Sequence, residues 1–115
     1  MNEKTMMIIL LVTFVATGLL FIGLAIPMIW QKIPPNPIYG FRVAKTMNNP
    51  DVWYPANEYM GWGILWSGVL IVLVSLILFF IPGIKSTVYQ IASVSTMLIS
   101  VIVSLILSFR YLSTL

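Results

Sequence analysis

The stretch Ile33–Gly61 reads IPPNPIYGFRVAKTMNNPDVWYPANEYMG and separates one long apolar run from two others. Only nine of the 115 residues carry a charge, six basic and three acidic. Four of the nine, Arg42, Lys45, Asp51 and Glu58, lie within this stretch. Because a few well-placed polar groups give a binding site its specificity, we expect any specific recognition by this protein to be located here.

The three apolar runs are each long enough to cross a bilayer. They cover approximately residues 6–29, 60–81 and 88–109, and a spanning helix needs about 20 apolar residues. The chain is 60% hydrophobic and only 8% charged, whereas about a quarter of the residues in a soluble domain are charged. We predict an all-α polytopic membrane protein with three transmembrane helices. A structured proline-rich loop, residues 33–61, joins the first two, and residues 1–115 form a single domain.

The length of the first run bears on whether it is a signal peptide. Its apolar part is about twice as long as the core of a signal peptide, and no clear cleavage site interrupts it. This favours a retained transmembrane helix.

Two residue types with characteristic chemistry are absent from the chain. Cysteine is missing, which excludes disulfides, thiolate nucleophiles and thiolate metal sites. Histidine is also missing, which removes the commonest general base and metal ligand. The net charge of +3 comes from scattered residues with no basic stripe that could follow a phosphate backbone, so we expect no nucleic-acid partner.

The distribution of basic residues predicts an orientation in the membrane. The side of the proline-rich loop holds four of them and the opposite side two: Lys32, Arg42, Lys45 and Arg110 against Lys4 and Lys85. Since the side richer in Lys and Arg usually faces the cytoplasm, we predict a cytoplasmic loop and an external N-terminus.

Local signals predict how the loop and the helix ends are built. Three prolines in residues 34–37 forbid a helix and favour extended backbone. The sequence Asn49-Pro50-Asp51 is typical of a helix start, whereas Pro55 is predicted to bend or interrupt that helix. At the start of the last predicted helix, Ser86 or Thr87 is expected to be the N-cap.

A stripe of small residues follows the last predicted helix. Its members recur at every fourth position: Ala92, Thr96, Ser100, Ser104 and Ser108. Small residues allow close helix packing in membranes, and we favour this interpretation because none of these side chains can ionise. A polar lane for a permeating solute is the alternative. The partner helix could belong to the same chain or to a second copy, so a homo-oligomer stays open.

The acidic residues give little support for catalysis or metal binding. Asp51 and Glu58 are seven residues apart, which places them near one helix face if the segment is helical. We prefer the interpretation that Asp51 stabilises a helix N-terminus and Glu58 marks the membrane boundary. No charge lies in the middle of a predicted helix, where ionisable groups usually mark function. We predict no enzyme activity, no metal and no cofactor, and small proton-coupled multidrug exporters do not fit.

The proline-rich loop contains more specified residues than a simple connection needs. Trp53, Asn57 and Gly61 are spaced by four and would share one helix face. Arg42 presents a rigid fork of donors, which could bind Asn57, Glu58, Asp51 or carbonyls that the prolines leave open. A binding role and a purely structural role fit this pattern equally well.

The loop pattern resembles that of the SdpI family of bacterial membrane proteins. The residues that carry the resemblance are Asn36, Pro37, Gly40 and Arg42, followed by Trp53, Asn57 and Gly61. The resemblance implies a fold with one helix before the motif and two after it. The named family member has additional spans before this module, and Val43 stands where the family often has Thr. That member confers immunity to a secreted peptide toxin and is thought to hold a repressor at the membrane.

These observations lead to one preferred function and two alternatives. We expect an SdpI-like immunity or signalling factor in the bacterial inner membrane that binds a peptide toxin or protein partner without catalysis. The loop residues expected to carry binding are Asn36, Gly40, Arg42, Trp53, Asn57, Glu58 and Gly61. The alternatives are a small transporter or lipid-binding protein, and an accessory subunit of a larger membrane complex.

Overall fold

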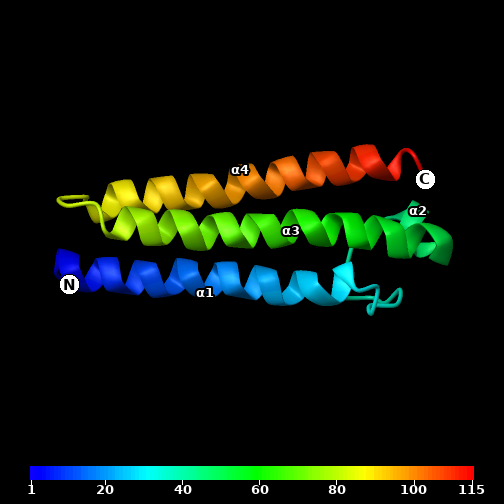
Figure 1. The fold of residues 1–115 in the computed structure, drawn as a ribbon, viewed down its shortest axis with the longest axis horizontal. Coiled ribbons are helices and arrows are strands. Elements are labelled where there is room, and N and C mark those ends of the chain that lie inside the picture. Colours follow the sequence, from blue (N-terminus) through cyan, green and yellow to red (C-terminus); the bar gives the residue numbers. More distant parts are fainter.

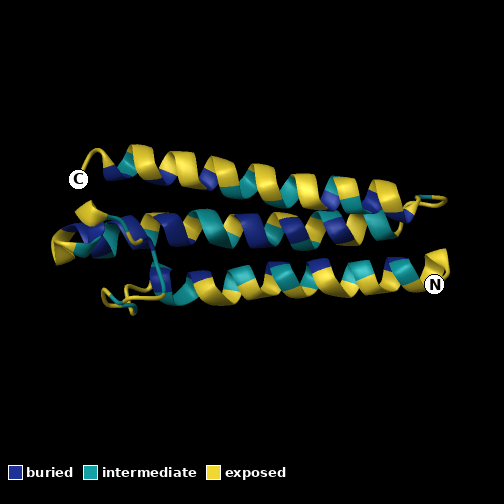
Figure 2. Ribbon diagram, turned by 180° about the vertical axis from the view of Figure 1, so that it is seen from behind, coloured by how far each residue is buried: buried dark blue, intermediate teal, exposed yellow.

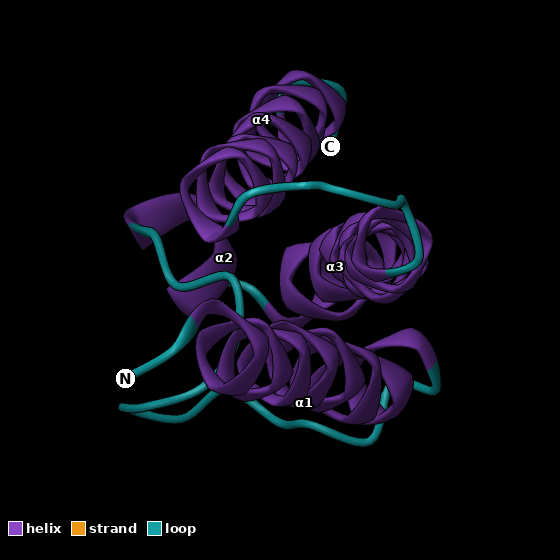
Figure 3. Ribbon diagram, turned by 90° about the vertical axis from the view of Figure 1, so that its left-hand side faces the viewer, coloured by secondary structure: helices purple, strands orange, loops and turns teal.

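The computed structural model describes residues 1–115 and contains only helices: α1 (Glu3–Ile29), the short α2 (Ala44–Met47), α3 (Pro50–Phe79) and α4 (Ser86–Leu112). The three long helices run antiparallel with α3 in the middle (Figure 1). Seen from one end, they form a triangle (Figure 3). α3 packs extensively against both α1 and α4, which pack only lightly against each other. The predicted all-α fold class is confirmed.

All three long helices are long and apolar enough to cross a membrane. Large apolar side chains face outward along each of them, such as Leu20, Leu73 and Ile99, which are at least half exposed. Figure 2 shows this exposed surface along the whole length of the bundle. Such a surface is suited to contact with hydrocarbon, and the chain is a multi-pass membrane protein, as predicted.

α3 begins at Pro50, ten residues before the second span that the sequence predicts at residues 60–81. Asn49 is its N-cap, because Asn49 Oδ1 accepts a hydrogen bond from Asp51 N at 2.9 Å, and Pro50 is the first helical residue. The predicted interruption at Pro55 is wrong. Pro55 is the sixth residue of the helix, where its missing N–H removes only the bond to the carbonyl of Asp51, and α3 continues through it.

The start of α4 differs from the prediction. Neither Ser86 nor Thr87 is the N-cap, since Lys85 occupies that position without a capping side chain. The open N–H groups of a helix start attract an acceptor, and here Glu3 of α1 supplies it. Glu3 Oε2 accepts from Ser86 N at 3.0 Å and Glu3 Oε1 accepts from Ser86 Oγ at 2.8 Å.

Glycines allow α3 to approach both neighbouring helices closely. A Cβ atom on Gly18 of α1 would lie 2.7 Å from the carbonyl oxygen of Gly68, and one on Gly68 would lie 2.6 Å from that of Gly18. A Cβ atom on Gly63 would overlap with Ser104 Oγ of α4. Backbones in membranes pack this closely only where small residues meet.

The buried apolar side chains form two clusters, one at each end of the bundle. The cluster beside α2 contains Met28, Phe41, Val52, Ala56, Met60 and Leu112. The cluster at the opposite end contains Met7, Phe14, Ile71 and Tyr89. The first joins the proline-rich loop to all three long helices and so fixes the position of that loop.

Candidate functional site

We call residues 31–61 the cap: the segment that follows α1, the short α2, and the first three turns of α3. In its proline-rich part, the carbonyl before each proline accepts a hydrogen bond from a side chain. Trp53 Nε1 donates to the carbonyl of Ile33 at 2.7 Å, and Asn36 Nδ2 donates to that of Pro34 at 2.8 Å. Arg42 Nε donates to the carbonyl of Asn36 at 2.7 Å. Prolines exclude these carbonyls from regular structure, and three side chains from the sequence motif satisfy them.

The amide of Asn36 organises the turn that follows the prolines. Its Oδ1 accepts from the backbone N–H groups of Ile38 and Tyr39 at 2.9 and 2.7 Å. Its Nδ2 also donates to the carbonyl of Tyr39 at 2.8 Å. Asn is favoured in turns because its short amide can bond the nearby backbone in this way. Asn36 is therefore a structural centre of the cap.

Trp53, Asn57 and Gly61 lie on one buried face of α3. Asn57 Oδ1 accepts from Phe41 N at 2.7 Å, and Asn57 Nδ2 donates to the carbonyl of Trp53 at 2.9 Å. Gly61 faces α1, where a Cβ atom would lie 3.2 Å from the carbonyl of Ala25. The face that the spacing predicted thus packs the cap against α3 and α3 against α1.

Gly40 lies where any larger residue would collide. Its φ is +118°, and a Cβ atom would lie 2.6 Å from Asn57 Oδ1 and 3.0 Å from the ring of Trp53. Positive φ is easily reached only by glycine. The structure thus brings Gly40, Trp53 and Asn57 into direct contact.

Arg42 and Glu58 lie at the exposed edges of this network. Arg42 binds one of the partners that the sequence allowed, the carbonyl of Asn36 before Pro37. The two terminal amino groups of its guanidinium form no hydrogen bond with the protein. Glu58 Oε2 accepts from Gln31 Nε2 at 2.7 Å. Asp51 lies in the first turn of α3.

The chain reverses after α1 through a residue that the sequence analysis missed. Gln31 has φ +56°, and its N–H donates to the carbonyl of Met28 while that of Lys32 donates to Pro27. This is the pattern of a helix end that usually carries glycine. The contact with Glu58 holds the Gln31 side chain, and no sequence signal indicated it.

α2 is attached to the rest of the cap and to α4 by two further residues that the sequence analysis did not select. Thr46 is fully buried; its Oγ1 donates to the carbonyl of Phe41 at 2.6 Å and accepts from Val43 N at 3.0 Å. Lys45 Nζ donates to the carbonyl of Leu112 at 2.8 Å, near the end of α4. A cation is favourable at a helix C-terminus. A Lys near the end of one helix gives no sequence signal for its partner.

Tyr39 connects the cap to α1. Its hydroxyl donates to the carbonyl of Leu24, and burial raises the pKa of this phenol above its usual value. The hydroxyl therefore keeps its proton and remains a donor at physiological pH.

The small residues of α4 fall into two groups. Ser104 and Ser108 are buried, whereas Ala92, Thr96 and Ser100 are half-buried. Thr96 Oγ1 donates to the carbonyl of Ala92 at 2.8 Å and Ser100 Oγ to that of Met97 at 3.1 Å. The hydroxyls of the first half thus bond their own helix, and Ser104 lies in the contact with Gly63 of α3.

The acidic groups do not gather into a metal site. No group of three or more Asp and Glu side chains lies close enough together to hold an ion. Asp51 lies in the first turn of α3, and Glu58 accepts a hydrogen bond from the side chain of Gln31. The two positions fit the structural interpretation of these acids.

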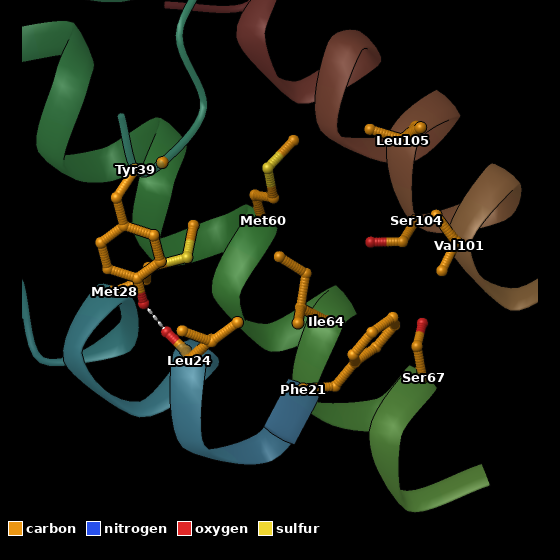
Figure 4. Close-up of a pocket in the computed structure, with 11 residues that line it drawn as sticks. Phe21, Leu24, Met28, Tyr39, Met60, Ile64, Ser67, Val101, Ser104 and Leu105 are labelled. Atoms are coloured by element: carbon orange, nitrogen blue, oxygen red, sulfur yellow. Dashed lines mark hydrogen bonds between the residues drawn. The ribbon is translucent and has the colours of Figure 1, made fainter. Parts of the chain in front are cut away.

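An apolar cavity of about 260 Å³ lies beneath the cap, between α1, α3 and α4 (Figure 4). Tyr39 and Gly40 of the cap line it, together with the hydroxyl-bearing Ser67 and Ser104. The other lining residues are apolar: Phe21, Leu24, Met28, Met60, Ile64, Val101 and Leu105. The cavity is suited to an apolar ligand.

A family model described as the SdpI/YfhL protein family matches residues 32–111. The matched segment contains nearly all of the cap, the whole of α3 and most of α4. Neither a curated protein nor a solved structure matches the chain.

Proposed function

Because this chain belongs to the SdpI/YfhL protein family, we propose that it is an immunity or signalling factor of the bacterial inner membrane. It binds a peptide toxin that has entered the membrane, or a protein partner, through the cap and carries out no catalysis. The lipid bilayer surrounds its three long helices.

The observation that carries this proposal is the way the cap presents two exposed side chains from a fixed backbone. Ile38 is 88% exposed, although its N–H is bonded to Asn36 Oδ1. Arg42 is exposed as well, and its Nε is fixed on the carbonyl of Asn36. A surface that is already ordered loses less entropy when it binds, and Arg is frequent among the residues that dominate binding energy.

The acidic side chains support a non-catalytic role. A general acid or base needs a perturbed environment and access to substrate. Asp51 favours the N-terminus of α3, and Glu58 is bonded to Gln31. Neither acid lies in the cavity beneath the cap.

We place the cap and the C-terminus in the cytoplasm, because four of the six basic side chains lie on that side. The chain has no cysteine, so a single introduced cysteine is labelled without background. Cysteine at Ile38 should be labelled by a membrane-impermeant reagent only after the cells are opened. Cysteine at Asn2 should be labelled in intact cells, and the reverse pattern would contradict this orientation.

Protection of sensitive cells is the direct test of the immunity function. Cells that produce this chain should survive secreted antimicrobial peptides that kill cells with an empty vector. Ile38→Ser should lose protection while the protein is still made and folded, because Ile38 makes no buried contact. The matched control is Ile81→Ser, an apolar-to-polar change in the turn at the opposite end of the bundle.

The signalling function is tested by capture of a partner. The chain is purified in mild detergent from its native host, and stoichiometric proteins are compared between wild type and Ile38→Ser. A partner that is lost with Ile38→Ser and kept with Ile81→Ser supports binding through the cap. The proposal would be contradicted if cells that produce the chain were killed as readily as cells with the empty vector, and if Ile38→Ser also lost no partner.

A further inference from the structure

The cavity beneath the cap reaches from the cap into the membrane. Leu24, which lines it, lies six residues before Trp30, which caps the end of α1. At 1.5 Å per residue this is about 9 Å along the helix. α3 and the cap close two sides, whereas α1 and α4 pack only lightly against each other. The side between α1 and α4 is therefore the one that backbone packing closes least, and lipid chains surround the bundle there.

A basic residue lies two positions along the chain from a residue that lines this cavity. Gly40 lines the cavity, and Arg42 follows two residues later, so their Cα atoms are at most about 7.6 Å apart. The Nε atom of Arg42 is fixed on the carbonyl of Asn36. Its two terminal amino groups remain able to bind a phosphate with two parallel hydrogen bonds.

The end of the bundle that carries the cap also has an excess of positive charge. Lys32, Arg42, Lys45 and Arg110 lie there with only two acids, Asp51 and Glu58. Lys45 is bonded to the end of α4 and Glu58 to Gln31. Of the four cations, Arg42 is the one nearest in sequence to a residue that lines the cavity, and the two terminal amino groups of its guanidinium have no partner in the protein.

We propose that the cavity and Arg42 together bind one anionic phospholipid. One acyl chain fills the apolar space between α1, α3 and α4, and the phosphate binds the guanidinium of Arg42. An anionic headgroup is favoured because the cap has an excess of positive charge and basic groups at a membrane surface attract anionic lipids. This site shares Arg42 with the partner surface proposed above, but it does not depend on that proposal, because Ile38 takes no part in it.

The test uses the full chain reconstituted in bilayers of equal parts phosphatidylglycerol and phosphatidylcholine. The protein is released in mild detergent, and retained lipid is identified by native mass spectrometry. One retained phosphatidylglycerol per chain is expected, in clear excess over phosphatidylcholine. Arg42→Gln should reduce this preference about tenfold, because it removes a charge-assisted pair of hydrogen bonds.

Matched variants separate the headgroup contact from the chain contact. Val101→Trp places a large ring in the cavity and should abolish retention of either lipid. Ile102→Trp adds the same ring at the neighbouring position, which faces the bilayer, and should retain the lipid. Arg110→Gln removes a cation at the same end of the bundle. It lies five residues beyond Leu105, about 140° around α4, and should have no effect.

Three results would overturn the proposal. They are equal retention of the two lipids by wild type, unchanged preference in Arg42→Gln, and undiminished retention in Val101→Trp. Helix content and elution as a single species check that each variant is folded. If Val101→Trp does not fold, Leu105→Trp replaces it, since Leu105 also lines the cavity and is partly exposed.

Discussion

The carboxylate of Glu3, at the start of α1, binds Ser86 at the start of α4. Its two oxygens accept from Ser86 N at 3.0 Å and from Ser86 Oγ at 2.8 Å. At the opposite end of α4, Lys45 donates to the carbonyl of Leu112. α4 thus meets an acid at its N-terminus and a base at its C-terminus, which is the arrangement that a helix dipole favours. Both come from elsewhere in the chain.

Replacement of Glu3 should loosen the start of α4. Glu3→Ala leaves the Ser86 N–H without its acceptor, so amide exchange in the first turn of α4 should become several-fold faster. Lys4→Ala, an exposed change next to it, is the control and should leave that exchange unchanged. Equal exchange in Glu3→Ala and wild type would show that water replaces this contact without loss.

Trp53 should be needed for its N–H as well as for its volume. Trp53→Phe keeps much of the buried ring but leaves the Ile33 carbonyl without its donor. We expect a loss of about 1–3 kcal/mol in unfolding free energy, measured by denaturation in detergent. Trp53→Ala should cost more, about 3–5 kcal/mol, because it also opens a cavity. Equal stability of Trp53→Phe and wild type would contradict a role for the indole N–H.

Substitutions at Gly40 and Gly83 distinguish the cost of a positive φ from the cost of a steric clash. Both have positive φ, +118° and +75°, but only Gly40 has atoms close to its missing Cβ. Gly83→Ala should therefore cost about 1 kcal/mol. Gly40→Ala should cost about 1–3 kcal/mol more than Gly83→Ala, because its methyl group would overpack against Asn57 and Trp53. Thermal unfolding of the two variants side by side measures the difference, and equal losses would mean that the cap yields to the extra methyl group.

Gln31 should tolerate glycine better than a branched residue. Its left-handed backbone costs roughly 1–2 kcal/mol for a residue other than glycine, so Gln31→Gly regains about what it loses with the Glu58 contact. We expect a change below about 1 kcal/mol. Gln31→Val should destabilise the protein, since a branched residue at positive φ is strained. Thermal unfolding in detergent measures both variants, and the opposite order would contradict this account of the turn.

The sequence was sufficient to predict the elements that depend on local composition. The three long apolar runs became α1, α3 and α4, and Asn49 and Pro50 begin α3 as predicted. The spacing of Trp53, Asn57 and Gly61 predicted one face, and the structure places all three on it. The orientation in the membrane and the role of the cap residues stay predictions.

The features that the sequence could not reveal are contacts between distant segments. Glu3 and Ser86 are 83 residues apart and Lys45 and Leu112 are 67 apart, so no spacing rule connects them. Thr46 resembles any other polar loop residue until its burial is known. Pro55 misled the prediction of an interruption, because a proline inside a helix removes one backbone hydrogen bond, and a 30-residue helix that packs against two neighbours can tolerate that loss.

The matching of donors to the carbonyls before the prolines has a consequence for how this family diverges. A homologue that loses one of these prolines regains a backbone conformation in which the preceding carbonyl can find its own partner. The side chain that satisfied it then becomes dispensable. We therefore expect Pro34 and Trp53 to be inherited together, and likewise Pro37 and Arg42, so that each pair changes in concert along the branches of a family tree.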